Sequence, residues 1–245
     1  MIRLILRDPG TFFALGNTCL FALVSPLAFV VMLMTLVFII LSRWPATCSR
    51  KNLKGFWGVL QQAGNNPCWG LEMMGYACLV VALFAMINEA FVGFICSVCF
   101  GFANLLMAHR LNKGILDALP SFEKILKEIK CTRSLTPLLL ALLKEPIVLI
   151  ALGMLYAGLA AGGASLWAFP LICLAPYFAM VRRDMNRAIP QVCLSMCALW
   201  YALVGMANAK FCATIANICF AVAYLEIALQ EHRLYLKSED TSASP

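Results

Sequence analysis

The sequence predicts an all-α, polytopic membrane protein, a bundle of about eight transmembrane helices arranged as four hairpins. Three observations lead to this class. Hydrophobic residues make up 62% of the 245 residues and charged residues only 13%, whereas soluble domains are about 45–50% apolar and about 25% charged. Long apolar blocks alternate with short polar segments, and the basic residues gather in those segments. This composition excludes a soluble globular enzyme, a disordered chain and a nucleic-acid-binding module.

The four apolar blocks cover residues 9–42, 67–108, 146–181 and 190–230. As single straight helices they would measure roughly 50–63 Å, whereas the hydrocarbon core of a bilayer is about 30 Å thick. Each block therefore has to turn back on itself, and each has a turn signal near its middle. The helices expected from these turns cover residues 10–25, 27–42, 70–87, 91–108, 147–161, 166–181, 191–207 and 211–230.

The basic residues supply an independent prediction of topology. The net charge is +7, and of all the lysines and arginines only Lys210 falls at an expected hairpin tip. Because cytoplasmic loops of membrane proteins are rich in Lys and Arg, we expect both termini and the three long loops in the cytoplasm. The alternatives for residues 9–42 are a re-entrant hairpin and a single kinked span. A single span would put Arg43 to Lys54 on the other side, which favours the hairpin. The pattern fits a bacterial inner membrane and a eukaryotic endomembrane equally.

Two of the polar segments are expected to form amphipathic helices. Residues 120–130 place Phe122, Ile125, Leu126 and Ile129 on one face, and residues 52–62 do the same with Leu53, Phe56, Trp57 and Leu60. Lysine-rich helices of this kind lie in the membrane interface. They either brace the bundle or dock a protein partner, and the first role is the commoner. The polar residues after 237 are expected to be disordered.

A weak internal repeat divides the chain. Residues 4–16 (LILRDPGTFFALG) resemble residues 141–153 (ALLKEPIVLIALG), with a basic–acidic–Pro entry into an apolar helix in both. The pairs Cys99-Phe100 and Cys219-Phe220 are a further echo. The expected organisation is a first membrane half (1–110), an amphipathic cytoplasmic linker (111–145), a second half (146–232) and a tail (233–245). Two four-helix units would be parallel repeats, which some transporters have; chance similarity is the alternative.

Polar groups inside a membrane are costly and therefore indicate function. The residues that could line a solute path are Asn17, Asn104, Asn217, Glu226, Glu72, Pro170 and Pro176. Each has a simpler role. Asparagines hydrogen-bond between helices, the two glutamates reach the interface, and the carbonyls freed by the two prolines, which are expected to interrupt helix 166–181, find neighbouring partners.

The residues that catalysis requires are scarce. The two histidines, His109 and His232, each precede an arginine at a helix end, so they do not form a metal or haem site. Cys96 and Cys99 form a CxxC pair inside an apolar helix, where cysteine behaves as a small hydrophobe. The chain contains no GxSxG, HExxH, P-loop or dinucleotide motif. We therefore expect no cofactor and no metal, and an enzyme is the least favoured class.

Two functions from different classes remain. The first is a transporter or permease-like protein that moves a small solute, which the possible repeat, the interior asparagines and the prolines favour. The second is a non-catalytic membrane subunit or scaffold, which the scarcity of intramembrane charge and the two amphipathic segments favour. The transporter is the preferred hypothesis.

Overall fold

The computed structural model describes residues 7–22, 25–47, 55–66, 68–113, 122–132, 134–180 and 188–242, and all its regular elements there are helices. These elements are α2 (Pro9–Phe21), α3 (Pro26–Thr47), α4 (Phe56–Asn65), α5 (Trp69–Ile87), α6 (Phe91–Lys113), α7 (Phe122–Thr132), α8 (Thr136–Lys144), α9 (Pro146–Ala161), the 3-10 helix η1 (Gly163–Ala168), α10 (Phe169–Met180), α11 (Ile189–Ala207) and α12 (Phe211–Ser242).

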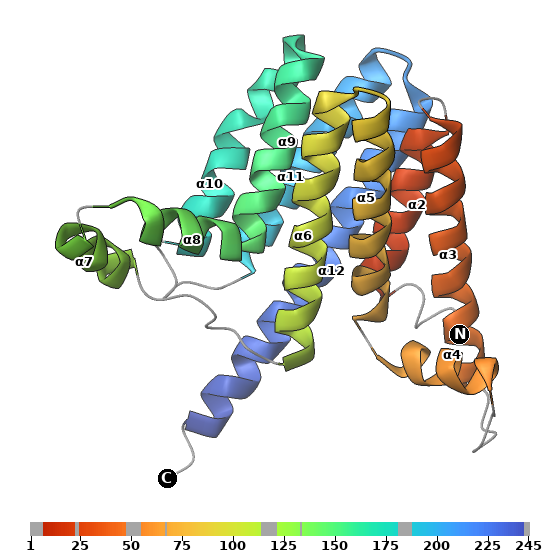
Figure 1. The fold of residues 1–245 in the computed structure, drawn as a ribbon, viewed down its shortest axis with the longest axis horizontal. Helices are drawn as coiled ribbons and strands as arrows, with labels where there is room; N and C mark the ends of the chain where they lie inside the picture. Colours follow the sequence, from red (N-terminus) through yellow and green to blue (C-terminus); the bar gives the residue numbers. More distant parts are fainter. Residues whose placement is uncertain are drawn as a thin grey trace.

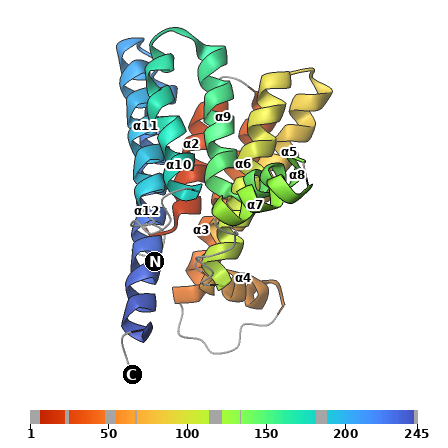
Figure 2. The same ribbon diagram turned by 90° about the vertical axis from the view of Figure 1, so that its left-hand side faces the viewer.

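Eight of these elements pair into four hairpins that stand side by side (Figures 1 and 2). The hairpins are α2–α3, α5–α6, α9–α10 with η1 at its turn, and α11–α12. Their tips all lie at one end of the bundle, at the top of Figure 1, and α4 and the long end of α12 lie at the other. We call these two ends the tip end and the foot. The predicted hairpin arrangement is thus present in the described residues.

Several of the helices are long and apolar enough to cross a bilayer. Six candidate spans are found in the described residues, at 26–43, 69–87, 91–113, 163–180, 189–207 and 211–236. The 13-residue helix α2 is only about 20 Å long, which is short for a span. Helix α9 forms an apolar pair with α8, bent by 87° at their junction. The chain is accordingly a multi-pass membrane protein with at least six apolar helices.

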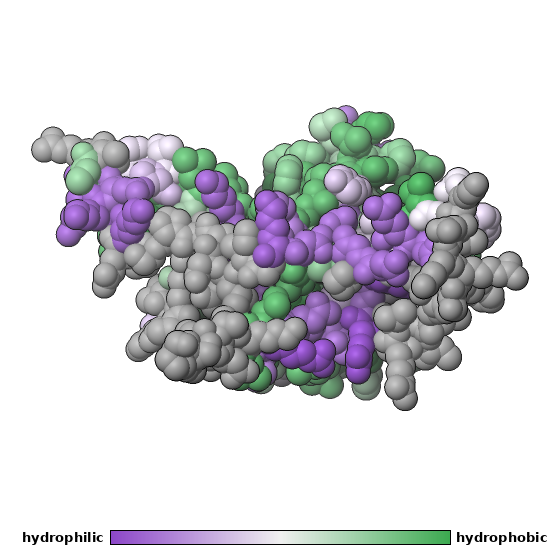
Figure 3. Space-filling view, turned by 90° about the horizontal axis from the view of Figure 1, so that it is seen from below, coloured by the Kyte–Doolittle hydropathy of each residue, from purple (hydrophilic) through white to green (hydrophobic). Residues whose placement is uncertain are grey.

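The outward faces of the bundle are those of a protein surrounded by lipid. On α3, exposed side chains recur at Leu27, Val30, Met34, Val37 and Leu41, which is one face of an α-helix. A water-soluble monomer rarely exposes apolar patches of this extent. Seen from the foot, hydrophilic side chains gather across the end of the molecule and hydrophobic ones appear at its sides (Figure 3).

The segments between and after the hairpins depart from the prediction in three places. Helix α12 runs to Ser242, so the expectation of a disordered tail was wrong for residues 238–242. Helix α4 begins at Phe56, because Gly55, with φ of 67°, precedes its first turn; residues 52–54 lie outside the described part. The prediction missed α8, whose apolar run is too short to stand out as a span.

Helix α7 confirms the amphipathic segment expected at 120–130 over residues 122–130, and residues 120 and 121 lie outside the described part. Its Ile125 is buried against Ala141 of α8, with Ile129 and Leu138 beside them. Leu126 remains exposed. The two helices form a small unit that joins the bundle where α8 packs on α9.

Candidate functional site

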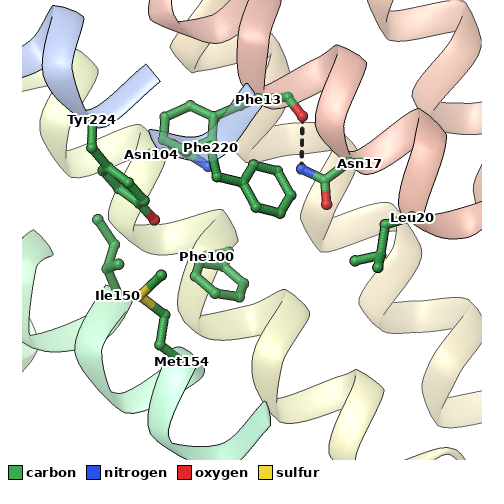
Figure 4. Close-up of a pocket in the computed structure, with 9 residues that line it drawn as sticks. All are labelled: Phe13, Asn17, Leu20, Phe100, Asn104, Ile150, Met154, Phe220 and Tyr224. Atoms are coloured by element: carbon green, nitrogen blue, oxygen red, sulfur yellow. Dashed lines mark hydrogen bonds between the residues drawn. The ribbon is translucent and has the colours of Figure 1, made fainter. Parts of the chain in front are cut away.

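A cavity of about 70 Å³ lies inside the bundle, between four helices from opposite halves of the chain (Figure 4). Helices α2, α6, α9 and α12 each contribute two or three side chains. The lining residues are Phe13, Asn17 and Leu20, then Phe100 and Asn104, then Ile150 and Met154, and finally Phe220 and Tyr224. The walls are therefore mainly aromatic and aliphatic, with three polar groups and no charged side chain.

Two of the polar groups are deeply buried and lack a partner. Asn104 is 5% exposed and Tyr224 is 2% exposed, and in the described residues neither side chain forms a hydrogen bond, whereas Asn17 in the same cavity does. The Tyr224 hydroxyl points into the cavity (Figure 4). A buried polar group without a partner is unfavourable by about 1–3 kcal/mol. These two groups are therefore available for a bound molecule or water.

Asn17 is the third polar group, and only the nitrogen of its side-chain amide is hydrogen-bonded. Its Nδ2 donates to the carbonyl oxygen of Phe13, 2.9 Å away on the preceding turn of α2. That bond fixes the side chain against its own helix and leaves the Oδ1 atom as an acceptor. Asn17 and Asn104, which lie on different helices, thus line the same space.

Aromatic packing fixes the wall formed by α2 and α12. The ring of Phe13 meets Tyr224 edge to face with centroids 5.1 Å apart, and it lies 6.1 Å from the ring of Phe220. Edge-to-face contacts of this kind are favourable for aromatic pairs. Glycines at Gly16 and Gly153 let the rings of Phe220 and Phe100 approach α2 and α9 closely.

A buried ion pair holds the foot of the first hairpin. Arg43 Nη2 lies 2.7 Å from Asp8 Oδ2, and both side chains are at most 4% exposed. Asp8 also caps α2 by accepting from the backbone N–H of Gly10, and Arg43 donates to the carbonyl oxygens of Gly64 and Asn66. Burial raises the pKa of the Asp8 carboxyl, while the Arg43 guanidinium opposes that rise. The pair joins α2, α3 and the end of α4.

A second ion pair holds the junction of α8 and α9. Arg110, near the end of α6, donates to both carboxylate oxygens of Glu145 at 2.9 and 3.1 Å, and to the carbonyl oxygen of Lys144 at 3.0 Å. Glu145 precedes Pro146, the first residue of α9. A bidentate pair fixes orientation as well as distance, so Arg110 stabilises the bend between the two helices.

The other predicted candidates lie away from the cavity. Asn217 Nδ2 donates to the carbonyl oxygen of Ala213 on its own helix, at 2.8 Å. Glu72 accepts from Asn112 Nδ2 at 2.7 Å, and Glu226 is half-buried on α12. Only Asn17 and Asn104 are brought together.

Only one of the two prolines interrupts its helix as the sequence suggested. Pro170 is the second residue of α10, where its missing N–H has no helical partner to lose. The expectation for Pro170 was wrong because α10 begins only after the 3-10 turn of η1. Pro176 does lie inside α10 and removes one backbone bond there, but it does not line the cavity.

Sequence reasoning missed the rest of the site. Phe13, Ile150, Met154 and Tyr224 carry no signal that separates them from other apolar residues of a membrane helix. Asp8 and Glu145 did carry one, because each is an acid directly before a proline that opens an apolar block. Their partners, Arg43 and Arg110, were expected only as loop charges.

The described part of the chain contains no cluster of three or more residues suited to holding a metal ion. Cys96 of the CxxC pair donates from Sγ to the carbonyl oxygen of Gly153 at 3.4 Å, so it serves the contact between α6 and α9. No family model, curated protein or solved structure matches the chain. The chemistry that the cavity offers is hydrogen bonding within an apolar enclosure.

Proposed function

We propose that the protein is a transporter or permease that moves a small solute through a bundle of eight helices, built from two parallel four-helix repeats. The first repeat would comprise α2, α3, α5 and α6, and the second α9, η1–α10, α11 and α12. In this proposal α2 and α9 cross the membrane together with the six longer candidates, with both termini in the cytoplasm, and the cavity between the repeats is the solute site. The cavity's position between the repeats is the observation that carries it.

The first support for the repeat is the register of the opening hairpins. Pro9 opens α2 and Pro146 opens α9, 137 residues later. The candidate spans 26–43 and 163–180 have the same length, and the second also begins 137 residues after the first. The shared spacing therefore extends from the motif at 4–16 across both helices of the hairpin.

The second support is the turn at the tip of each closing hairpin. Helices α5 and α11 each contain 19 residues and begin 120 residues apart. The backbone N–H groups of Asn88 and Asn208 each donate to two carbonyl oxygens, those two and four residues earlier in the last turn. The next residues, Glu89 and Ala209, adopt positive φ values of 57° and 53°. A left-handed residue is uncommon outside glycine, so the shared conformation is informative.

The third support is a pair of contacts between the repeats. On α6, Arg110 donates to the carbonyl oxygen of Lys144 at 3.0 Å, and on α12, Gln230 donates to that of Arg7 at 3.1 Å. Arg110 and Gln230 are separated by the same 120 residues, and Arg7 and Lys144 by the same 137. Each repeat would thus place its last helix against the first helix of the other.

This correspondence relates the two sides of the cavity. Eight of the nine lining residues fall into four pairs at the same two intervals: Phe13 with Ile150, Asn17 with Met154, Phe100 with Phe220, and Asn104 with Tyr224. The cavity would then lie on the axis that relates the repeats. Transporters built from repeats hold their substrates at the repeat interface, which supports a transport function.

The decisive experiment is solute flux through proteoliposomes that contain only the purified chain. Stopped-flow light scattering would follow vesicle swelling in a panel of small neutral and charged solutes. We expect at least one solute to enter faster than it enters empty vesicles of the same lipid. Equal rates for every solute would contradict a self-sufficient transporter.

One observation favours the alternative, a non-catalytic membrane subunit. Helix α8 and the residue before it expose four leucines, Leu135, Leu139, Leu140 and Leu143, and α7 beside them carries lysines. Native mass spectrometry after gentle detergent extraction separates the two functions. A stoichiometric protein partner on the α7–α8 unit would support the subunit, and a lone chain or a homo-oligomer would support the transporter.

A further inference from the structure

We infer that the cavity binds a small uncharged solute that carries an amide or hydroxyl group on a short apolar body. This inference rests on the proposed function, because it names the substrate class of the same site. Three properties of the cavity carry it: the absence of charge in its walls, the unpartnered polar groups, and its volume.

Charge comes first. None of the nine lining residues is ionic, and the two buried acids described above, Asp8 and Glu145, are already engaged by Arg43 and Arg110 at the foot. An ion moved into such an enclosure would lose its hydration without gaining a counter-charge, which is strongly unfavourable. The walls therefore select a neutral solute over an anion, a cation or a zwitterion.

The polar groups define what the solute must offer. Tyr224 provides a hydroxyl that can donate or accept, Asn104 provides both an amide donor and a carbonyl acceptor, and Asn17 Oδ1 accepts. Asn104 and Tyr224 are both more than nine-tenths buried and have no hydrogen-bond partner in the described structure. A solute that carries both a donor and an acceptor supplies the hydrogen bonds that these two side chains lack. A purely apolar molecule would leave these groups unsatisfied.

The apolar walls and the volume of the cavity define the apolar part and the size of the solute. The rings of Phe13, Phe100 and Phe220 and the side chains of Ile150 and Met154 surround the polar groups (Figure 4). A cavity of about 150 Å³ accepts benzene, and one water needs about 10–15 Å³. At about 70 Å³, this cavity holds a solute smaller than benzene and larger than a single water. Acetamide, N-methylurea and 1-propanol have the required size and chemistry.

The test is saturation-transfer difference NMR on the purified full-length chain in detergent, with these three probes and with glycine as a zwitterion of similar size. Tyr224→Phe removes only the hydroxyl, and Asn104→Leu replaces the amide with an apolar group of similar shape. Asn217→Leu is the matched control, because Asn217 bonds within its own helix and lies outside the cavity. Size-exclusion chromatography verifies that each variant folds.

We expect at least one probe to give a signal with the native chain and with Asn217→Leu. That signal falls at least threefold in Asn104→Leu or in Tyr224→Phe, and glycine gives none. Silence from all three probes, which would mean that water alone fills the cavity, would overturn the inference. So would a signal that neither cavity variant changes. Binding without any flux through proteoliposomes would support the site and contradict the transporter. Flux of charged solutes without binding of the probes would support a transporter and contradict this substrate class.

Discussion

The ring of Phe220 on α12 lies against Gly16 on α2, where a Cβ atom would be 2.6 Å from the ring's Cε1 and 2.9 Å from the carbonyl oxygen of Ala216. Both distances are shorter than a carbon atom tolerates. The absence of a side chain at Gly16 is therefore what lets α2 and α12 approach closely enough to form one wall of the cavity. Gly153 on α9 has a looser version of the same contact, 3.2 Å from Phe100 Cζ.

The same substitution is expected to have different effects at the two glycines. Gly16→Ala forces the α12 backbone and the Phe220 ring to move, which destabilises the protein by about 1–3 kcal/mol. This loss outweighs the gain of about 0.8–1 kcal/mol that alanine's higher helix propensity gives. The alanine Cβ in Gly153→Ala meets the far edge of the Phe100 ring, which can shift, and lies 3.4 Å from Cys99 Cβ, so the stability of this variant changes little. Thermal unfolding of both purified variants in detergent checks this. Equal losses for the two would contradict the asymmetry of the contacts.

Removing Arg43 leaves the Asp8 carboxylate buried without its counter-charge. We expect Arg43→Met to destabilise the protein by about 3–5 kcal/mol, and a double variant with Asp8→Asn, which retains an N-cap side chain, to recover part of the loss. Denaturant titration measures both effects.

Arg110→Met is the control for this pair, because the Arg110 side chain is 18% exposed and solvent screens its bond to Glu145. The loss in Arg43→Met should exceed the loss in Arg110→Met. If Arg110→Met were the more harmful change, Asp8 and Arg43 would not form the main anchor of the foot.

The proposed eight-helix topology makes a prediction about the sides of the membrane. If α2 crosses the bilayer, an epitope tag before Arg7 and a tag between α3 and α4 lie on the same side, and a tag inserted at Glu89 lies on the other. Protease protection in sealed membrane vesicles distinguishes these positions, with a tag at Lys210 as the internal control. Opposite sides for the first two tags would mean that α2 does not cross.

The sequence predicted the hairpins well because their signals are local. The Asn88 and Asn208 turns interrupt apolar blocks that are too long for one span, and the prolines at 9, 26 and 146 open helices. Helix α8 was missed because a nine-residue element carries too little hydrophobicity to be distinguished from the linker around it.

The site was predictable only in part. Asn17 and Asn104 were identified as intramembrane polar groups, but their sharing of one cavity depends on which faces of α2 and α6 meet α9 and α12. The same holds for Asp8 and Arg43, which are 35 residues apart and meet only because α3 runs back alongside α2. Pairing of this kind is set by tertiary packing and leaves no periodic trace in the chain.

The most direct test of the central claim is to fill the cavity and measure flux. Met154 is 5% exposed and lines the cavity, whereas Met196 is 52% exposed on the outer surface of α11. With a solute that the native chain carries in proteoliposomes, we predict that Met154→Trp lowers the flux at least tenfold and that Met196→Trp leaves it unchanged. Flux that persists in a folded Met154→Trp variant would contradict a solute path through this cavity.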